Sequence, residues 1–406
     1  MTSRDALREV LDGNLCSGCG LCRAVASAGS VEIELSAEGY LRPVRMAPLS
    51  DAEDQRIRQV CPGLGLPRPD KDAPYHRDWG PVLSVRTGRA ADNELAYRAS
   101  SGGVLSALLI HLLKTGTIDY VLETGASRDV PTQNETRKTT GYDEVLAAVG
   151  SRYAPSAPLA TLRERLDQPG RFAIVGKPCD IAALRALAKV DSRIDDKIPI
   201  MLSFFCGGVP STHGTQQILE RMGAEKSDVT AFRYRGFGWP GKTTATLRDG
   251  TELTMDYNEA WGDILSKHVQ LRCKICPDGT GGFADIACAD AWHCDEKGYP
   301  TFKDADGRSL IISRTNKGEA LVRRAMKDGD LLATMAGLPD IETMQPFQAR
   351  RKRLVISRLL ALRLLGQAAP RYRGLQLARA SIDAGVWPNI RNFLGMARRI
   401  LLGRHP

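Results

Sequence analysis

Three closely spaced cysteines provide the clearest chemical signal in the chain. Cys16, Cys19 and Cys22 stand at C-x2-C-x2-C spacing with glycines between them, and three thiolates this close can wrap a compact inorganic cluster. A ferredoxin run would continue with a fourth cysteine, but Ala26 occupies that place, so Cys61 is the expected fourth ligand. Zinc sites usually present two separated ligand pairs instead. The spacing predicts an iron–sulfur cluster, with zinc as the alternative.

Other cysteines stand in turns that follow apolar strands. The turn 176–180 (GKPCD) carries Cys179, and Cys206 precedes two glycines at the end of the next apolar strand. Open α/β sheets bind ligands at the carboxyl ends of parallel strands, so both thiols are expected at one edge of a parallel sheet. Cys273 and Cys276 form a further C-x2-C pair.

Three loops have residue types that suit a phosphate or a conjugated ring. The first precedes an apolar helix at 104–114, and its serine and glycines can free N–H groups for an anion or simply cap the helix. The loops 150–156 and 232–241 combine arginine with aromatic residues, which suits a ligand or a packed turn. The candidate cofactor-binding residues are Ser101, Gly102, Gly103, Ser151, Arg152, Tyr153, Ser156, Arg235 and Trp239.

The composition indicates a globular protein with an unusual charge distribution. The chain has 406 residues, 43% of them hydrophobic, and ten cysteines without an apolar signal segment, which favours a reducing cytoplasm over a disulfide framework. Its net charge is +9, but residues 345–406 hold 13 Arg or Lys and one acid, so this tail carries +12 and the rest −3. The positive charge therefore belongs to the tail, and the acidic body does not suit nucleic acid.

These elements predict a mixed α/β (α+β) fold with additions at both ends. We expect a small ferredoxin-like cluster-binding segment at 1–65, a linker at 66–80, a catalytic domain at 81–344 and a basic helical extension at 345–406.

The ordered set of motifs resembles the coenzyme F420 hydrogenase/dehydrogenase beta-subunit family. The resemblance runs from Cys16 to about Thr315 and includes the cysteine run, the three loops, the turn 176–180 and the segment 285–292. It implies FAD and iron–sulfur clusters in a chain that passes electrons between a partner protein and an organic acceptor. The run Cys288-Ala289-Asp290 stands where the family leads us to expect a glycine before the aspartate.

With Cys288 and Cys294 set aside, the remaining thiols form a second set of four, which predicts two [4Fe-4S] clusters. Cys288 is expected to be a packed thiol, and an exchange of one ligand between the sets stays open. A proton donor is needed near the flavin, although a solvated or capping role is the default for each candidate. The candidates are Lys177, Asp180, His213, His268 and Asp290.

Three functions stay open at this stage. The first is a self-contained FAD and iron–sulfur reductase, fed by a ferredoxin-like donor, that reduces an organic acceptor such as F420, a tetrapyrrole or a lipid-linked molecule. The second is an F420-reducing or electron-transfer beta subunit of a hydrogenase or dehydrogenase complex. The third is a zinc-stabilised binding module. The sequence alone favours the first.

The tail contains a basic amphipathic helix at 388–403. Phe393, Leu394, Met396, Ala397, Ile400 and Leu401 gather on one face, and Arg391, Arg398 and Arg399 on the opposite one. Such a helix can pack on this protein or an oligomer partner, or lie in a membrane interface. We therefore expect a cytoplasmic protein, with peripheral membrane contact as one alternative.

Overall fold

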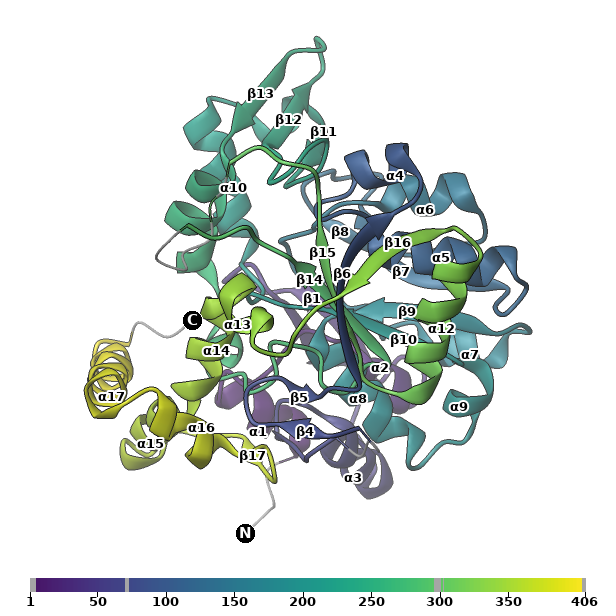
Figure 1. Cartoon of the computed structure of the whole chain (residues 1–406). Helices are drawn as coiled ribbons and strands as arrows, with labels where there is room; N and C mark the ends of the chain where they lie inside the picture. Colours follow the sequence, from purple (N-terminus) through teal and green to yellow (C-terminus); the bar gives the residue numbers. More distant parts are fainter. Residues whose placement is uncertain (1–4, 70–72, 296–300, 302, 404–406) are drawn as a thin grey trace.

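A mixed sheet of eight strands forms the centre of the computed structural model, which describes residues 5–69, 73–295, 301 and 303–403 (Figure 1). In spatial order the strands are β16 (Leu331–Met335), β6 (Ser84–Ala90), β15 (Ser309–Ser313), β14 (Ile286–Asp290), β10 (Met201–Phe204), β9 (Phe172–Gly176), β7 (Tyr120–Ala126) and β8 (Asn134–Thr139). The neighbours β14, β10, β9 and β7 run parallel, and the outer strands pair antiparallel. The predicted mixed α/β fold is confirmed.

The strands that carry the cysteine turns are buried on both sides. Phe172, Ala173 and Ile174 of β9 have no exposed surface, as a central parallel strand requires. β9 pairs with β10 in parallel, which confirms the predicted arrangement of the two strand ends. The predicted helix at 104–114 is α5 (Val104–Lys114), and α8 (Pro178–Ala188) begins directly after β9 with a proline in its first turn.

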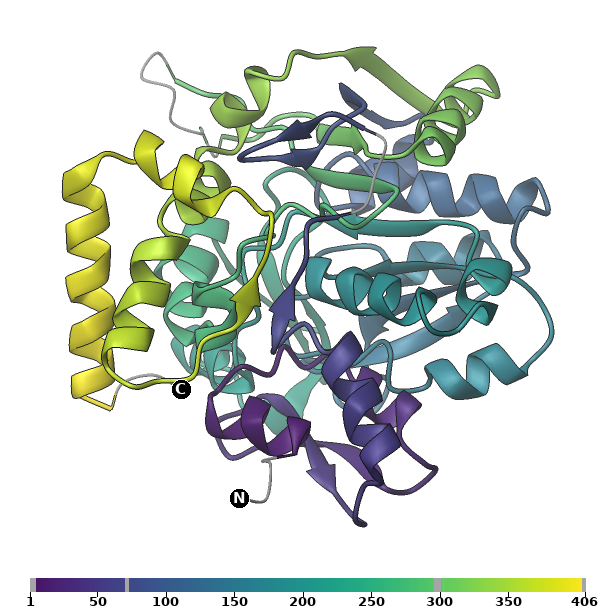
Figure 2. The same cartoon turned by 90° about the horizontal axis from the view of Figure 1, so that it is seen from below.

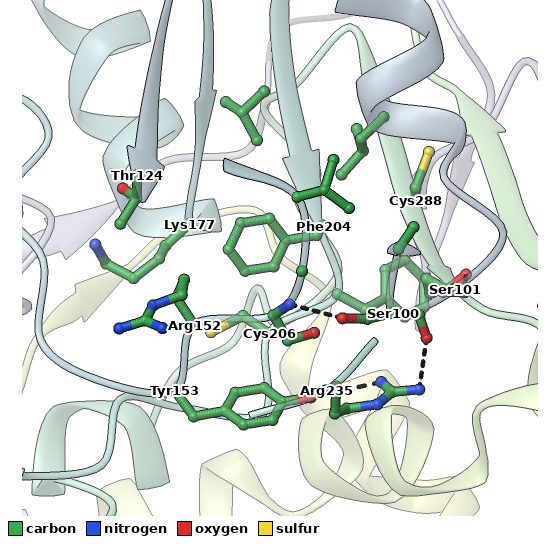
Figure 3. A pocket seen from close by; sticks show the side chains of 18 of the residues that line it. Ser100, Ser101, Thr124, Arg152, Tyr153, Lys177, Phe204, Cys206, Arg235 and Cys288 are labelled. Atoms are coloured by element: carbon green, nitrogen blue, oxygen red, sulfur yellow. Dashed lines mark hydrogen bonds between the residues drawn. The ribbon is translucent and has the colours of Figure 1, made fainter. Parts of the chain in front are cut away.

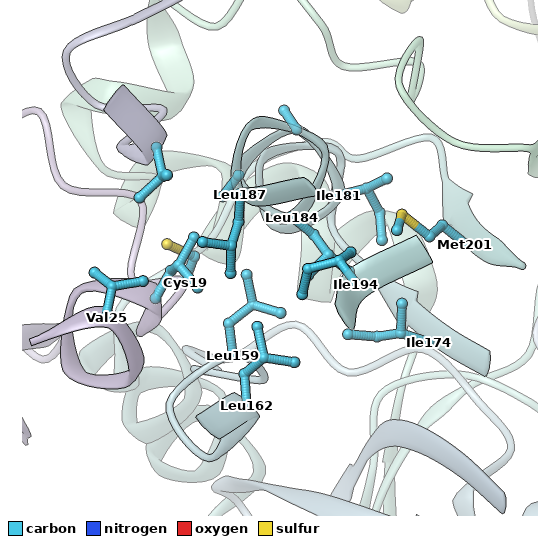
Figure 4. Packing of buried hydrophobic residues seen from close by; sticks show 14 of the residues in the cluster. Cys19, Val25, Leu159, Leu162, Ile174, Ile181, Leu184, Leu187, Ile194 and Met201 are labelled. Atoms are coloured by element: carbon cyan, nitrogen blue, oxygen red, sulfur yellow. The ribbon is translucent and has the colours of Figure 1, made fainter. Parts of the chain in front are cut away.

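Helices cover both faces of the sheet. On one face, α5 and α12 (Asn316–Lys327) pack through residues such as Leu108 and Val322. On the other face, α8 packs with α7 (Leu162–Asp167) and the N-terminal segment, through residues such as Leu184 and Leu162 (Figure 4). The sheet therefore forms the middle layer of three.

The N-terminal cysteine segment packs against the main body. Its elements are α1 (Ala6–Asp12), α2 (Leu21–Val25), β1 (Val31–Leu35), β2 (Leu41–Arg45) and α3 (Asp51–Val60). Cys19 and Val25 belong to the same apolar cluster as Leu184 and Leu187 of α8 (Figure 4). The bounds of the four predicted segments stay predictions, and their residues 1–4, 70–72 and 404–406 lie outside the described residues.

A smaller three-stranded sheet projects beside the centre, as Figure 1 shows. It consists of β11 (Val229–Arg233), β12 (Thr243–Leu247) and β13 (Glu252–Met255), and α10 (Thr212–Met222) packs on it. The remaining elements are β3 (Gly65–Leu66), β4 (Tyr75–His76), β5 (Gly80–Pro81), α4 (Asn93–Arg98), α6 (Tyr142–Ala148), α9 (Arg193–Lys197), the 3-10 turns Lys226–Asp228 and Leu265–His268, the π-helical turn Asn258–Ile264, α11 (Leu271–Lys274), α13 (Asp340–Met344) and β17 (Arg371–Tyr372).

The C-terminal extension is helical, as predicted, and lies at one side of the molecule (Figure 2). Its helices are α14 (Pro346–Arg353), α15 (Val355–Leu364), α16 (Leu377–Asp383) and α17 (Val386–Leu401). The predicted single apolar face of α17 is divided: Phe393, Met396, Ala397 and Ile400 pack in the protein, whereas Leu394 and Leu401 are exposed. None of the described helices has both the length and the apolar character needed to cross a membrane.

Candidate functional site

A cavity of about 280 Å³ lies at the carboxyl ends of the parallel strands (Figure 3). This volume is slightly below the range for small-molecule sites, roughly 300–1,000 Å³. The loops after β9 and β10 and the last residues of β14 contribute to its walls, in agreement with the rule for ligand sites in open α/β sheets. Of the candidate cofactor-binding residues, seven line it: Ser101, Gly103, Ser151, Arg152, Tyr153, Ser156 and Arg235.

The loop before α5 brings backbone against the cavity. Gly102 and Gly103 have φ values of 67° and 73°, in the left-handed region that favours glycine. A Cβ atom on Gly102 would stand 2.8 Å from the carbonyl oxygen of Gly307. Gly103 is the N-cap of α5, and no side chain of the described residues caps this helix start. The Ser101 hydroxyl donates instead to Arg308 O at 3.0 Å. The first N–H groups of α5 therefore remain available to an anion in the cavity.

The second loop is held rigidly by its arginine. The Arg152 guanidinium donates to Asn134 Oδ1, Phe232 O, Pro131 O and Gln133 O at 2.8–2.9 Å. Burial lowers the pKa of Arg152. With these partners, Arg152 supports the cavity wall and has little capacity left for a phosphate.

The third loop joins the cavity through a buried ion pair. Arg235 donates to both carboxylate oxygens of Asp290 at 2.8 and 2.9 Å, and to Ser100 O at 2.7 Å (Figure 3). Trp239 Nε1 donates to Asp290 Oδ1 at 3.0 Å, and its ring stacks on Trp292 with centroids 4.7 Å apart. Trp239 thus stands behind the cavity wall, where it fixes Asp290. Bidentate pairs of this kind hold a carboxylate firmly.

A second buried ion pair lies between the cavity and the N-terminal cysteines. Lys177 Nζ lies 2.9 Å from Asp180 Oδ2, and donates to Ser156 Oγ at 2.8 Å and Ser156 O at 3.0 Å. Burial lowers the pKa of Lys177, but Asp180 and the nearby thiols of Cys179 and Cys19 raise it more, so the ammonium stays charged. Asp180 Oδ1 is buried and has no partner among the described residues, which leaves an acceptor for a ligand.

The two candidate histidines do not reach the cavity. His213 is exposed at the start of α10. His268 contacts Gln217 Oε1 at 2.9 Å and Ser211 Oγ at 3.4 Å, away from the cavity lining, and burial lowers its pKa. Of the five proposed proton donors, the structure therefore brings only Lys177, Asp180 and Asp290 to the cavity.

The first cysteine set converges on one small space. Cys16, Cys19, Cys22 and Cys61 all line a narrow cavity between the N-terminal helices. Gly18 N donates to Cys16 Sγ at 3.4 Å, so backbone turns toward the sulfur as the spacing suggested. Burial, followed by neighbouring charges, raises the pKa of Cys19 to about 12. The thiols therefore need a cationic centre to ionise in this environment.

The second set gathers around α11 and the ends of β9 and β10. Burial is the largest cause that raises the pKa of Cys179, and Cys206 and Cys273 raise it further. Burial also raises the pKa of Cys206, with smaller contributions from Cys273 and Cys276. Val209 N donates to Cys273 Sγ at 3.4 Å. Within the described ranges, no group of three or more His, Cys, Asp or Glu side chains could hold a metal ion. The four thiols of the second set are thus neighbours, but in the part of the chain that the structure describes neither set closes on a single ion.

Arg272 lies between the two cysteine sets. Its side chain is 2% exposed, Nη2 donates to Pro62 O at 2.7 Å, and Nε has no partner. Burial raises the pKa of Cys61, and the charge of Arg272 offsets part of that rise. Burial lowers the pKa of Arg272 itself, but Tyr372 and the thiols of Cys276, Cys179 and Cys273 raise it more. The part of the chain that the structure describes gives it no carboxylate partner.

The two remaining cysteines lie outside both sets. Cys288 is buried on β14 and lines the main cavity, and burial raises its pKa to about 12. Cys294 Sγ donates to Thr343 O at 2.8 Å.

Three residues that contact the cavity or the second cysteine set were not predicted from the sequence. Gln345, which was assigned to the tail, lines the cavity and donates to Asp290 O at 2.6 Å. Arg351 donates to Cys206 O at 2.6 Å and to Cys273 O at 2.9 Å, so α14 holds the second set. Glu123 on β7 also lines the cavity, and its only sequence signal was a carboxylate inside an apolar strand.

Comparisons with known proteins identify a family that matches this chain. Two family models of the coenzyme F420 hydrogenase/dehydrogenase beta subunit match the chain, the N-terminal model at residues 85–163 and the C-terminal model at 170–336, together more than half of it. A subunit of the F(420)H(2) dehydrogenase of Methanosarcina mazei is 27% identical over 77% of this chain and 83% of its own. The beta subunit of the coenzyme F420 hydrogenase of Methanococcus voltae is 26% identical over 72% and 99%.

A solved structure shares the fold. It is a chain of the F420-reducing [NiFe] hydrogenase complex from Methanosarcina barkeri, with a TM-score of 0.57 and 21% identity. The match covers 74% of this chain and 98% of that one.

Proposed function

Because the chain belongs to the coenzyme F420 hydrogenase/dehydrogenase beta-subunit family, we propose that it is the iron–sulfur flavoprotein subunit of an electron-transferring oxidoreductase complex. The proposal assigns it FAD, two [4Fe-4S] clusters and F420 or another organic molecule as electron acceptor. Both named relatives are subunits of F420-linked enzymes. This supports the beta-subunit alternative of the sequence analysis better than the self-contained, ferredoxin-fed reductase that the sequence alone favoured.

The main observation behind the proposal is that Cys206 belongs to both the cavity and the second cysteine set. This residue lines the cavity at the sheet edge and is also a member of the second cysteine set. A cluster held by that set would therefore adjoin a flavin in the cavity. Lys177 and Asp180 also line the cavity, and both lie close to Cys19 of the first set.

The buried positive charge of Arg272 is a second argument for two anionic clusters. A guanidinium that is removed from water and has no carboxylate partner is unfavourable by several kcal/mol unless an anion compensates it. A cube bound by four thiolates is anionic, and Arg272 faces thiols of both sets. Neutral, unliganded thiols would leave its charge uncompensated.

The cavity residues fit a dinucleotide cofactor. The uncapped start of α5 offers N–H groups to a phosphate, and the unpartnered Asp180 Oδ1 offers an acceptor to a donor group. When bound, a flavin accepts electrons singly and passes them on as a pair. The Lys177 ammonium holds a positive charge beside the cavity that stabilises negative charge on a bound ligand, and Arg235 keeps the Asp290 carboxylate oriented.

Anaerobic purification followed by cofactor analysis tests the cofactor assignment. We expect one FAD and about eight irons per chain. Cys206→Ser should lose about four of these irons. The matched control is Cys288→Ser, because Cys288 lines the same cavity but belongs to neither set, and this variant should keep all of them. Zinc in place of iron, or equal iron loss in both variants, would contradict the cluster assignment.

Electron transfer to F420 tests the acceptor. The protein, reduced with dithionite and freed of excess reductant, should bleach the visible absorbance of added F420, and Cys206→Ser should do so far more slowly than Cys288→Ser. A protein with full cofactor content that leaves F420 oxidised would keep the flavoprotein assignment but require another acceptor.

A further inference from the structure

Helix α17 presents a second apolar face that nothing in the described structure covers. At about 100° per residue, Phe393, Met396 and Ile400 fall on an inner arc, and these residues pack against α15. Beside the small, partly buried Ala397, an adjacent outer arc of about 100° holds large apolar side chains that are exposed to solvent. These are Val386, Trp387, Ile390, Leu394 and Leu401.

The outer arc is strongly exposed. The relative exposure is 77% for Trp387, 59% for Leu394 and 73% for Leu401, and Ile382 at the end of α16 adds 76%. In Figure 2, α17 is the outermost element on its side of the molecule. A row of large apolar side chains on a protruding helix costs free energy in water, so it marks an interaction surface.

The charge around this face indicates what covers it. Arg391 and Arg398 border the outer arc and are exposed, and α17 contains no acidic residue. Asp383, the single acid in residues 345–406, is paired with Arg77 at 2.8 Å. The surface is therefore apolar along its centre and positive along its edge, which complements a layer that is apolar inside and anionic outside.

We propose that the outer arc of α17 lies in the surface of a bilayer that contains anionic phospholipid. Trp387 then sits at the level of the headgroups, the leucines enter the acyl region, and Arg391 and Arg398 meet lipid phosphates. A second copy of this chain suits the face less well, because pairing through it brings the same arginines of both copies together. This inference does not depend on the proposed cofactors or acceptor.

Vesicle flotation of the full chain tests the inference. The protein should float with vesicles of phosphatidylcholine containing about 30% phosphatidylglycerol, less with phosphatidylcholine alone, and less again at high salt. The double variant Trp387→Ser/Leu394→Gln should lose binding. Arg391→Gln and Arg398→Gln should each weaken binding about fivefold, the equivalent of about 1 kcal/mol per arginine.

A matched control tests whether vesicle binding depends on this face of α17 or on any exposed apolar side chain. Met335 on β16 is 67% exposed and lies outside the tail, so Met335→Gln should bind vesicles like the unaltered protein. Circular dichroism should show the same fold in all variants, since every altered side chain is exposed. The inference is overturned if the unaltered protein does not float, if the double variant floats equally well, or if the face instead forms a dimer that Leu394→Gln dissolves.

Discussion

Replacing Arg272 by glutamine should lower the reduction potentials of both proposed clusters. Arg272 directly precedes Cys273 of the second set in the sequence. Its side chain donates to the carbonyl oxygen of Pro62, which directly follows Cys61 of the first set. Its charge therefore lies close to both sets. A positive charge favours the reduced, more negative state of a cluster. Removing the charge should therefore make both clusters harder to reduce.

The size of the shift follows from Coulomb's law. At a separation of about 7 Å and an effective dielectric constant of about 20, a unit charge contributes about 2 kcal/mol. For a one-electron couple, about 1.4 kcal/mol corresponds to about 59 mV, so we expect a decrease of about 100 mV at each cluster. The guanidinium does not titrate in the accessible range, so the decrease should be independent of pH.

A redox titration followed by EPR measures both potentials, with Cys19→Ser and Cys273→Ser used to assign the two signals. Arg272→Lys keeps the charge and should restore most of the shift. Arg351→Gln is the matched control, because Arg351 donates to the carbonyl oxygens of Cys206 and Cys273, which both belong to the second set, and should therefore affect mainly the second cluster. A shift of one cluster only in Arg272→Gln, or no shift in either, would refute the position of Arg272 as the cation shared by both sets.

Two further predictions concern the cavity wall. Burial raises the pKa of Glu123 to about 7, so its stabilising contribution is complete below the ordinary value near 4.5 and is lost as the pH rises through about 7. The free energy of unfolding of Glu123→Gln, relative to the unaltered protein, should therefore be higher at pH 8 than at pH 4.5 by up to about 3 kcal/mol. Thermal unfolding at both pH values measures this, and a difference that is constant with pH would contradict it. Gly102→Ala should lower the free energy of unfolding by about 1–2 kcal/mol, because an alanine is strained in the left-handed backbone conformation. The close contact of the new Cβ atom with Gly307 O should lower it further and should also reduce FAD retention. Gly116 has a similar φ, and a Cβ atom added there would have no neighbouring atom within 4 Å. In thermal unfolding Gly116→Ala should therefore show only the cost of the backbone conformation. Equal losses of stability in both variants would contradict a destabilising contact between residue 102 and Gly307 O.

The sequence by itself determined the local elements and the classes of chemistry. The apolar stripe of α5 and the buried runs of β9 and β10 are set by side-chain periodicity and hydrophobicity, which act over a few residues. The spacing of Cys16, Cys19 and Cys22 is equally local, since three ligands within two turns of chain meet in almost any compact conformation. The positions of Cys179 and Cys206 at one sheet edge followed from the topology of parallel strands.

Only the tertiary structure decided which distant residues share a site. Gln345 and Arg351 reach the cavity and the second cysteine set from a segment whose composition indicated only a basic tail. His213 and His268 have the right chemistry but lie on elements that face elsewhere. Arg272 gains its significance from burial between two sets that are far apart in sequence. Residue type and spacing specify what a side chain can do, but long-range packing specifies its neighbours, and charge and burial depend on those neighbours.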